Sequence, residues 1–161
     1  MIGDPSAARA APLHVFNFHV TFGDASFAGG DGAELPLVEG AFAEISGLEA
    51  TLEPKGIREG GLNGHLHQRP GPVTHATVIL KRGVTRARDL ARWFDVIGSG
   101  HYAGRLNVDV EVRDGQGEPV LRFRLLRALP VKFKAADLNA RATEVGIEEL
   151  HLVHEGLEHE A

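Results

Sequence analysis

The segment from Arg105 to Ala128 reads RLNVDVEVRDGQGEPVLRFRLLRA, and its pattern points to a β fold. Apolar and polar residues alternate on both sides of a central DGQG. Because successive side chains of a strand point to opposite faces, each half has one apolar and one polar face. DGQG favours a tight turn between the halves. The segment therefore predicts an antiparallel hairpin whose apolar face carries Leu106, Val108, Val110, Val112, Leu121, Phe123 and Leu125.

Three further segments have the composition of strands. Leu129–Lys134 is short, and we expect Val131 and Phe133 to point inward. Val73–Gly83 is β-branched and apolar on both faces, which is typical of a central strand. Leu13–Phe22 alternates, which is typical of a half-buried strand whose inner face carries Phe16, Phe18, Val20 and Phe22.

Two other segments are less regular. Residues 38–53 predict a short strand, a break at Gly47 and then more extended chain. Residues 143–156 predict the last strand, but its apolar phase shifts between Ile147 and Leu150. We therefore expect a bulge near Glu148–Glu149.

The period changes in Thr85–Gly98, which predicts the one helix. Thr85 suits an N-cap and Gly98 a C′ position. Apolar residues recur at i, i+3, i+4 and i+7, which makes one helical stripe. The stripe consists of Leu90, Trp93, Phe94 and Ile97.

The chain of 161 residues suits one domain, and it contains no internal repeat and no second core. The pattern predicts a mainly β fold, an antiparallel sandwich or barrel of about six or seven strands flanked by one α-helix. Within the single domain 1–161, we expect a flexible N-terminal arm at 1–12, an extended loop at 23–40 and a long loop at 48–72.

Composition excludes several classes of function. The net charge of −5 argues against a protein that binds nucleic acid by charge alone. No cysteine is present, so disulfides and thiolate metal sites are excluded. No apolar run approaches the ~20 residues of a membrane span, and the first residues lack a signal-peptide pattern. We therefore expect synthesis in the cytoplasm, no export by the general route and no membrane contact by the isolated chain.

The stretch Ile57–Gly71, IREGGLNGHLHQRPG, admits three interpretations. A phosphate cradle is disfavoured, because the stretch lacks the Lys-Ser/Thr pair and no helix pattern follows it. A metal site on His65 and His67, with His75 nearby, is chemically possible. The chain has nine histidines, however, so near-pairs arise by chance. The third interpretation is a surface shaped for another protein.

Catalytic patterns are absent from the sequence. It has no G-x-S-x-G elbow and no cysteine nucleophile. The carboxylates of Asp109 and Glu111 could act as acid and base, but they are better explained by cross-strand pairs with arginines. We expect no enzymatic activity, no metal and no cofactor.

The order of several short motifs resembles the inner tube proteins of contractile phage tails and phage-like contractile injection systems, including the type VI secretion tube protein. The resemblance covers roughly Leu13 to Leu157. Its first strings are FAEISGLEA, EPKGIREGGLNG, RPGPVTHATVILKRGVT and LARWF. They contain Phe42, Ser46-Gly47-Leu48, Arg58–Gly61, Asn63, Pro70-Gly71 and Leu80–Gly83. The C-terminal part contributes Pro130–Lys132, Leu138–Ala140, Glu144, Ile147-Glu148, Leu150, Leu152 and His154–Leu157.

This resemblance implies a structural role. Six subunits would form a ring, and rings would stack into a hollow rod inside a contractile sheath that drives the rod through a target envelope. The implied partners are further copies of the chain, sheath protein, baseplate and tube-initiator proteins, and a cargo of effector protein or phage DNA. The resemblance leaves open whether the machine is a phage tail or a headless particle released from the cell, although it favours the latter.

The resemblance also implies roles for particular residues. We expect contacts between subunits or rings from Glu53, Arg58, Glu59, Gly60, Gly61, Asn63, Gly64, Pro70 and Gly71. Candidates for the lumen are Asn107, Asp109, Glu111, Arg122 and Arg124. Candidates for the sheath-facing surface are Arg86, Arg88 and Arg92. The long 23–40 segment and the arginine-rich helix depart from the usual family pattern.

The competing hypothesis is a soluble monomeric β-sandwich that serves as a binding or adaptor module. Such a module needs a concave aromatic site. Aromatic residues make up only 6% of the chain, and most occupy inward strand positions. The oligomeric state distinguishes the two hypotheses.

Overall fold

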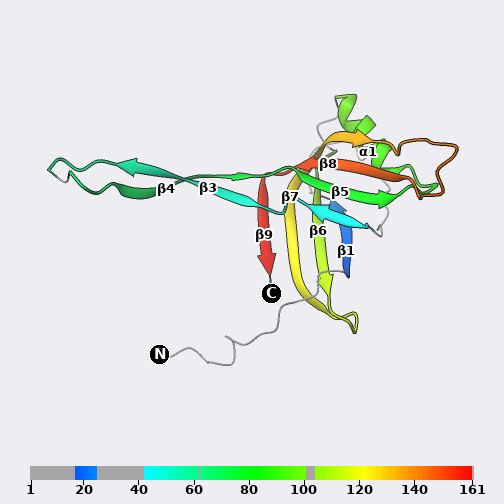
Figure 1. The fold of residues 1–161 in the computed structure, drawn as a ribbon, viewed down its shortest axis with the longest axis horizontal. Coiled ribbons are helices and arrows are strands. Elements are labelled where there is room, and N and C mark those ends of the chain that lie inside the picture. The colour runs from blue at the N-terminus through cyan, green and yellow to red at the C-terminus, as the bar shows by residue number, and fades with distance from the viewer. Residues whose placement is uncertain (1–16, 25–41, 62, 101–103, 161) are drawn as a thin grey trace.

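The computed structural model describes residues 17–24, 42–61, 63–100 and 104–160 (Figure 1). These residues form antiparallel strands and one helix, so the expected mainly β class is confirmed. The N-terminal segment 1–12 and most of the 23–40 segment lie outside the described residues. The elements are β1 (Phe18–Asp24), β2 (Glu44–Ser46), β3 (Ala50–Ile57), β4 (His67–His75), β5 (Val78–Gly83), α1 (Asp89–Gly98), β6 (Leu106–Arg113), β7 (Pro119–Lys134), β8 (Ile147–Val153) and β9 (Gly156–Glu160).

Strand β7 joins the two halves of a seven-stranded sheet. The strand order is β1-β6-β7-β8-β5-β2, and β9 pairs with the first part of β7. The two halves run in nearly perpendicular directions in Figure 1. The change of direction follows a bulge at Leu126 and Arg127, where Arg127 has φ 50° and donates its N–H to Oδ1 of Asn107 at 3.0 Å. Such bulges let one strand serve two packed sheets.

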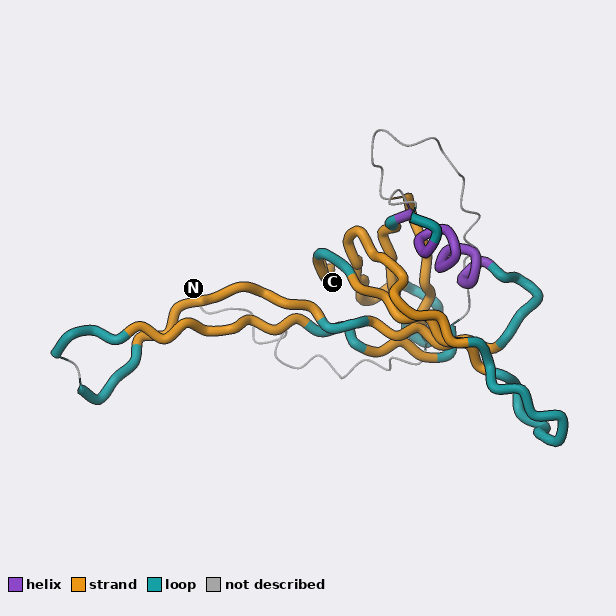
Figure 2. The backbone as a smooth tube through the Cα atoms, turned by 90° about the horizontal axis from the view of Figure 1, so that it is seen from above, coloured by secondary structure: helices purple, strands orange, loops and turns teal. Residues whose placement is uncertain are grey.

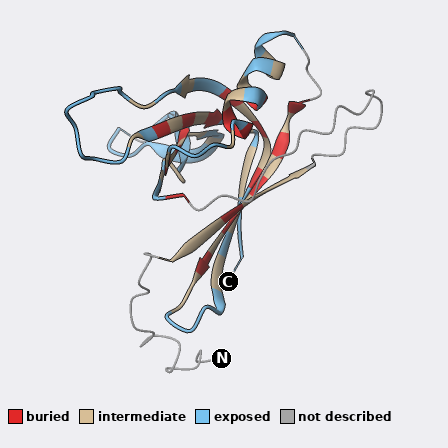
Figure 3. Ribbon diagram, turned by 90° about the vertical axis from the view of Figure 1, so that its right-hand side faces the viewer, coloured by how far each residue is buried: buried red, intermediate tan, exposed pale blue. Residues whose placement is uncertain are grey.

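The core lies between these two halves and beneath α1. The predicted hairpin supplies one wall, β5 and β8 supply the other, and the buried residues concentrate in this body (Figure 3). Leu90 and Trp93 of the helical stripe are buried, and Phe94 and Ile97 are half-buried. The indole N–H of Trp93 donates to the carbonyl of Gly104. The fully buried strand residues are Val20, Val78, Leu80, Val108, Val110, Leu125, Leu150 and Leu152.

The predicted bulge near Glu148–Glu149 is wrong. Strand β8 pairs with β5 in unbroken register, from Ile147 opposite Gly83 to Leu152 opposite Val78. Glu148 shares the buried face with Leu150 and Leu152. A buried carboxylate, and not an extra residue, breaks the apolar pattern.

The inward position predicted for Val131 is also wrong, since its exposed fraction is 46%. The register of β7 against β8 shifts between Pro130 and Lys132, and this bulge turns Val131 outward. Phe133 packs against the core as expected. Residues 129–134 are therefore the end of β7 and not a separate strand.

Both predicted helix caps are displaced. The helix begins at Asp89 after an N-cap at Arg88, while the hydroxyl of Thr85 donates to the carbonyl of Ala87 at 3.4 Å. Gly98 is still helical, and Gly100 takes the left-handed conformation with φ 92°. The positively charged residues before Asp89 thus precede the helix.

The segment 48–72, expected to be a loop, is largely a two-stranded hairpin. Strands β3 and β4 pair with each other and with no other described strand. Together with their connecting turn they form an arm, residues 50–75, that projects far from the body (Figures 1 and 2). The expected central strand 73–83 is divided accordingly: its first residues end β4, and Val78–Gly83 form β5.

Gly47 makes the junction between β2 and the arm possible, as the predicted break suggested. Its φ is 85°, and a Cβ here would lie 2.1 Å from the carbonyl oxygen of Thr77. Gly47→Ala should therefore lower the free energy of unfolding by at least about 2 kcal/mol. The matched control is Gly60→Ala, where a Cβ meets nothing within 4 Å, and we expect a change within about 0.5 kcal/mol. Urea unfolding followed by fluorescence of Trp93 measures both; equal stabilities would contradict the prediction.

Within the described part of the chain, no helix has the length and apolar character needed to cross a bilayer.

Candidate assembly surfaces

The arm is exposed along almost its whole length. It carries four large apolar side chains with exposed fractions of 39–52%, namely Leu52, Ile57, Leu66 and Val73. A two-stranded hairpin is only marginally stable alone, and exposed apolar side chains on a projection are typical of interaction surfaces. The arm is therefore suited to contact another molecule.

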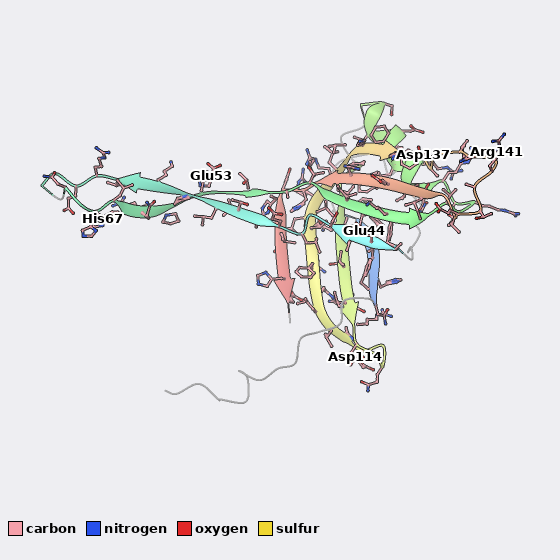
Figure 4. All side chains as sticks on the ribbon, viewed as in Figure 1. Glu44, Glu53, His67, Asp114, Asp137 and Arg141 are labelled. Carbon is pink, nitrogen blue, oxygen red and sulfur yellow. The ribbon has the colours of Figure 1, made fainter. Side chains whose placement is uncertain are left out.

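The predicted contact residues occupy two parts of the arm. Arg58–Gly61, Asn63 and Gly64 lie at its end, where they border an open hollow of about 670 Å³. Glu53, Pro70 and Gly71 lie midway along it; Figure 4 labels Glu53 there and His67 nearer the end. Within the subunit, the carboxylate of Glu59 lies 2.9 Å from Nε2 of His67, so Glu59 already has a partner inside the arm.

The glycines of the arm serve different purposes. Gly61 has φ 97°, as expected for a turn glycine. Gly60 and Gly64 do not have a positive φ, and a Cβ added at either would meet no described atom within 4 Å. At Gly71, a Cβ would lie 2.0 Å from the carbonyl oxygen of Glu53. Close backbone approach inside the subunit therefore requires Gly71, whereas nothing in the described part of the subunit requires Gly60 or Gly64.

The two chemical hypotheses for the arm gain no support from its geometry. His65 is exposed at the end of the arm, and His75 lies at its base, opposite Ala50. Across the described residues, no three His, Asp or Glu side chains come together as a metal site. A strand follows the glycine-rich turn, so no helix N-terminus is available to hold a phosphate.

A second surface is the polar face of the predicted hairpin. It consists of the outward side chains of β6 and β7, and all five lumen candidates belong to it. Arg124 donates to Asp109 at 2.7 Å, and Arg122 donates to Glu111 at 3.0 Å. Arg113 donates to the other oxygen of Glu111 at 2.8 Å. The predicted cross-strand pairing of these carboxylates with arginines is confirmed.

These pairs also act on the ionisation of the groups. Hydrogen bonds from Arg122 and Arg113 lower the pKa of Glu111. The hydrogen bond to Asp109 and its charge, with smaller contributions from Glu160 and Glu158, raise the pKa of Arg124. Both shifts favour the charged forms of Glu111 and Arg124.

Asn107 has a role of its own in this face. Its side-chain oxygen accepts the N–H of Arg127 and so closes the bulge where β7 changes direction. The alternation of polar and apolar residues is what places Asn107 among the lumen candidates. The same alternation does not reveal that its side chain holds the bulge of β7.

Strand β9 extends the polar face, and sequence reasoning missed it. It places Glu160 opposite Arg122 and Glu158 opposite Arg124. On its other face, Leu157 packs against the core. The alternation of Leu157 and His159 with two glutamates is the sequence pattern that could have predicted this strand. It spans only five residues, which is too few for a firm prediction.

The three sheath-facing candidates are exposed. Arg86 and Arg88 border a hollow of about 630 Å³ together with Phe133, and Arg92 lies in the first turn of α1. They are therefore available to a partner.

A buried charge cluster fixes α1 to the sheet, and sequence reasoning did not find it. Arg82 of β5 is 4% exposed and donates to the carboxylates of Asp89 and, at 2.5 Å, Glu148. Its guanidinium carbon also lies 5.7 Å from the ring centroid of Phe42. Burial alone would raise the pKa of Asp89, but the hydrogen bond and charge of Arg82 outweigh it and lower that pKa. This cluster holds the start of the helix against β5 and β8.

Two histidines meet at the base of the arm. The rings of His75 and His154 lie 4.8 Å apart, and Nδ1 of His154 contacts the carbonyl oxygen of Gly156 at 2.8 Å. Burial lowers the pKa of His154, and the neighbouring His75 lowers it further. The hydrogen bond with Gly156 opposes these effects without outweighing them. The ring of His154 is therefore a neutral packing element at neutral pH.

Comparison with known structures shows the same architecture. A chain of the anti-feeding prophage baseplate is 28% identical, with TM-score 0.74 over 93% of this chain and 96% of that one. A chain of the PVC extracellular contractile injection system sheath–tube complex is 18% identical, with TM-score 0.77 over 100% and 99%. Hcp1 from Flavobacterium johnsoniae is 12% identical, with TM-score 0.55 over 88% and 93%. The last two likenesses are evidence for the fold alone.

Family membership follows from sequence. A comparison with proteins of curated function returns no match. The family model described as T4-like virus tail tube protein gp19, by contrast, matches residues 14–158, almost the whole chain. The chain therefore belongs to the T4-like virus tail tube protein family, and it is a structural inner tube subunit.

Proposed function

We propose that six copies of the chain close into a ring and that rings stack into a hollow tube. The observation that carries this proposal is a pair of open strand edges. Among the described strands, β1 and β9 each pair on one side only, and they border the same half of the sheet. Open edges present unpaired N–H and C=O groups. Joining β1 of one copy to β9 of the next satisfies both edges and closes a continuous inner barrel.

The polar face then lines the lumen. The apolar side of this half of the sheet packs against the core of the subunit. The polar face must therefore point either into the lumen of the ring or to its outside. The inside placement explains why this surface carries so many charges that satisfy one another. Asp109, Glu111, Arg122 and Arg124, together with Asn107, are the proposed lumen residues.

The arm connects copies of the subunit. Its length carries it beyond the body, so it reaches a neighbouring subunit or the next ring (Figure 2). Its exposed apolar side chains become buried in that contact, and Arg58 forms a salt bridge with a carboxylate of the neighbouring copy. Gly60 and Gly64 allow the partner's backbone to approach closely.

The assembled tube meets the other parts of the machine. Arg86, Arg88 and Arg92 contact the surrounding sheath, and the tube begins on baseplate and initiator proteins. Similar structures come from sheath–tube, baseplate and tube-terminator complexes, which supports these partners. The tube assembles in the bacterial cytoplasm and conveys effector protein or phage DNA when the sheath contracts.

Electron microscopy and size-exclusion chromatography of the purified chain test the proposal. We expect rings or rods with a central hole. A monomer of about 17 kDa at all concentrations, with no rings, would contradict it and favour the β-sandwich adaptor.

A further inference from the structure

The arginines of the described polar face are each paired with a carboxylate. Two rows cross the four strands of this half of the sheet in register. One row is His19, Glu111, Arg122 and Glu160, and the other is Thr21, Asp109, Arg124 and Glu158. Each row therefore places an arginine of β7 between an acid of β6 and an acid of β9.

Beyond these rows, the same arrangement continues along the strands. Arg113 donates to Glu111 near the turn. At the other end, Arg105 and Arg127 donate to the two oxygens of Glu155, at 2.9 and 2.8 Å. Together, the groups of the two rows and of these further pairs comprise five guanidinium groups and five carboxylates.

The two kinds of acid do different things. The acids of β6 accept hydrogen bonds, but each uses only part of the arginine fork, and the side chains of Arg122 and Arg124 remain 45% and 44% exposed. A guanidinium has five N–H donors, so the remaining ones could hold a phosphate in the bidentate manner that arginine favours. Glu158 and Glu160 lie on the side of the arginines away from β6. A carboxylate there repels a phosphate that approaches the free donors.

We propose that Glu158 and Glu160 are specificity-determining residues that deny the polar face to nucleic acid and other polyanions. With both carboxylates present, a polyanion finds no unopposed positive charge on the described part of this face. A protein cargo with mixed surface charge meets a balanced surface to which it does not adhere. The effect on cargo rests on the proposed luminal position of the face, whereas the effect on polyanion binding does not.

The test removes the two charges without changing side-chain shape. The variants are E158Q/E160Q and, as a control with the same net charge, D137N/E144Q in the exposed 135–146 segment at the far side of the body (Figure 4). Binding of a labelled single-stranded oligonucleotide is measured by fluorescence anisotropy in low salt. We expect E158Q/E160Q to bind at least about tenfold tighter than both the native chain and the control, with affinity that falls steeply with salt. Equal affinity of the two double variants overturns the proposal.

Two additional comparisons assign the effect. E158Q and E160Q alone should each give a smaller gain, which keeps the test informative if the double variant folds poorly. Adding R122Q and R124Q to E158Q/E160Q should abolish the gain; binding that survives their removal contradicts the proposal. In assembled rods of E158Q/E160Q, linear strands should bind and closed circular single strands should not, because a circle cannot thread the lumen. If both bind equally, the luminal position fails while the role of Glu158 and Glu160 stands.

Discussion

Arg82→Met is expected to lower the free energy of unfolding by about 3–5 kcal/mol, because it leaves two buried carboxylates without their cation. Asp89 is 6% exposed and Glu148 is 8% exposed, so water cannot replace the lost guanidinium. Methionine keeps most of the volume, so the loss reports charge and hydrogen bonding more than packing. Urea unfolding followed by fluorescence of Trp93, the one tryptophan, measures it.

Controls separate this explanation from a general loss of arginine. Arg86→Met, at an exposed position, should change the free energy of unfolding by no more than about 0.5 kcal/mol. Changing the two acids as well, in R82M/D89L/E148M, should recover much of the stability, since buried charge clusters are often replaceable by apolar residues. A loss below about 1 kcal/mol in R82M would show that the cluster does not hold α1.

The pH dependence of the same variant has a definite sign. In the native chain, the pKa of Asp89 is lower than the ordinary aspartate pKa of about 3.9. Asp89 therefore stabilises the fold at pH values above about 3.9, and this stabilisation is lost as the pH falls through the pKa of the folded state. In R82M, burial without a cation raises the pKa of Asp89, which destabilises the fold above about pH 4. The difference between native and variant should therefore shrink between about pH 7.5 and about pH 4.5.

Deleting Gly60–Gly64 is expected to abolish rods while leaving rings. Ile57 pairs with His67, and the deletion leaves four residues between them, enough for a hairpin turn. The arm becomes shorter but keeps its register. The free energy of unfolding should stay within about 0.5 kcal/mol of native, because the end of the arm projects away from the body (Figure 2). Electron microscopy of the purified variant measures the ratio of rings to rods.

A length-preserving variant provides the control for this deletion. G60S/G64S keeps the reach of the arm and removes both glycines, so it distinguishes length from close backbone approach. If reach alone matters, its rods are normal; if approach matters too, it stacks poorly. Rods of native spacing from the deletion variant would refute the proposed role of the arm.

Much of the fold could be predicted from local patterns. Alternation identifies the faces of the 105–128 hairpin, and the i, i+3, i+4, i+7 stripe identifies the buried side of α1. These patterns succeed because strand and helix geometry alone decide which side chains share a face. The paired charges of Asp109 and Glu111 follow from the same alternation.

The failures have a common physical cause. Glu148 interrupts an apolar pattern and so suggests a bulge. A carboxylate can occupy a buried face only when a cation pairs with it, and the cation here, Arg82, is 66 residues away in the sequence, where a local pattern does not reveal it. The glycines and prolines of the arm suggest a loop, because both are poor strand formers. Its strands exist because β3 and β4 satisfy each other's backbone groups.

Local periodicity and motif order were enough to establish the mainly β class, the hairpin that builds one wall of the core, the helix and the family. A chain carries such patterns before it folds. The folded structure was needed to show that Arg82, Asp89 and Glu148 meet, that β7 bends to serve both halves of the sheet, and that β9 returns to place two acids beside Arg122 and Arg124. Those features depend on pairing between segments that are distant in the sequence. The energy of a buried charge or of an open strand edge depends on which groups lie beside it in the folded chain, and local sequence does not specify them.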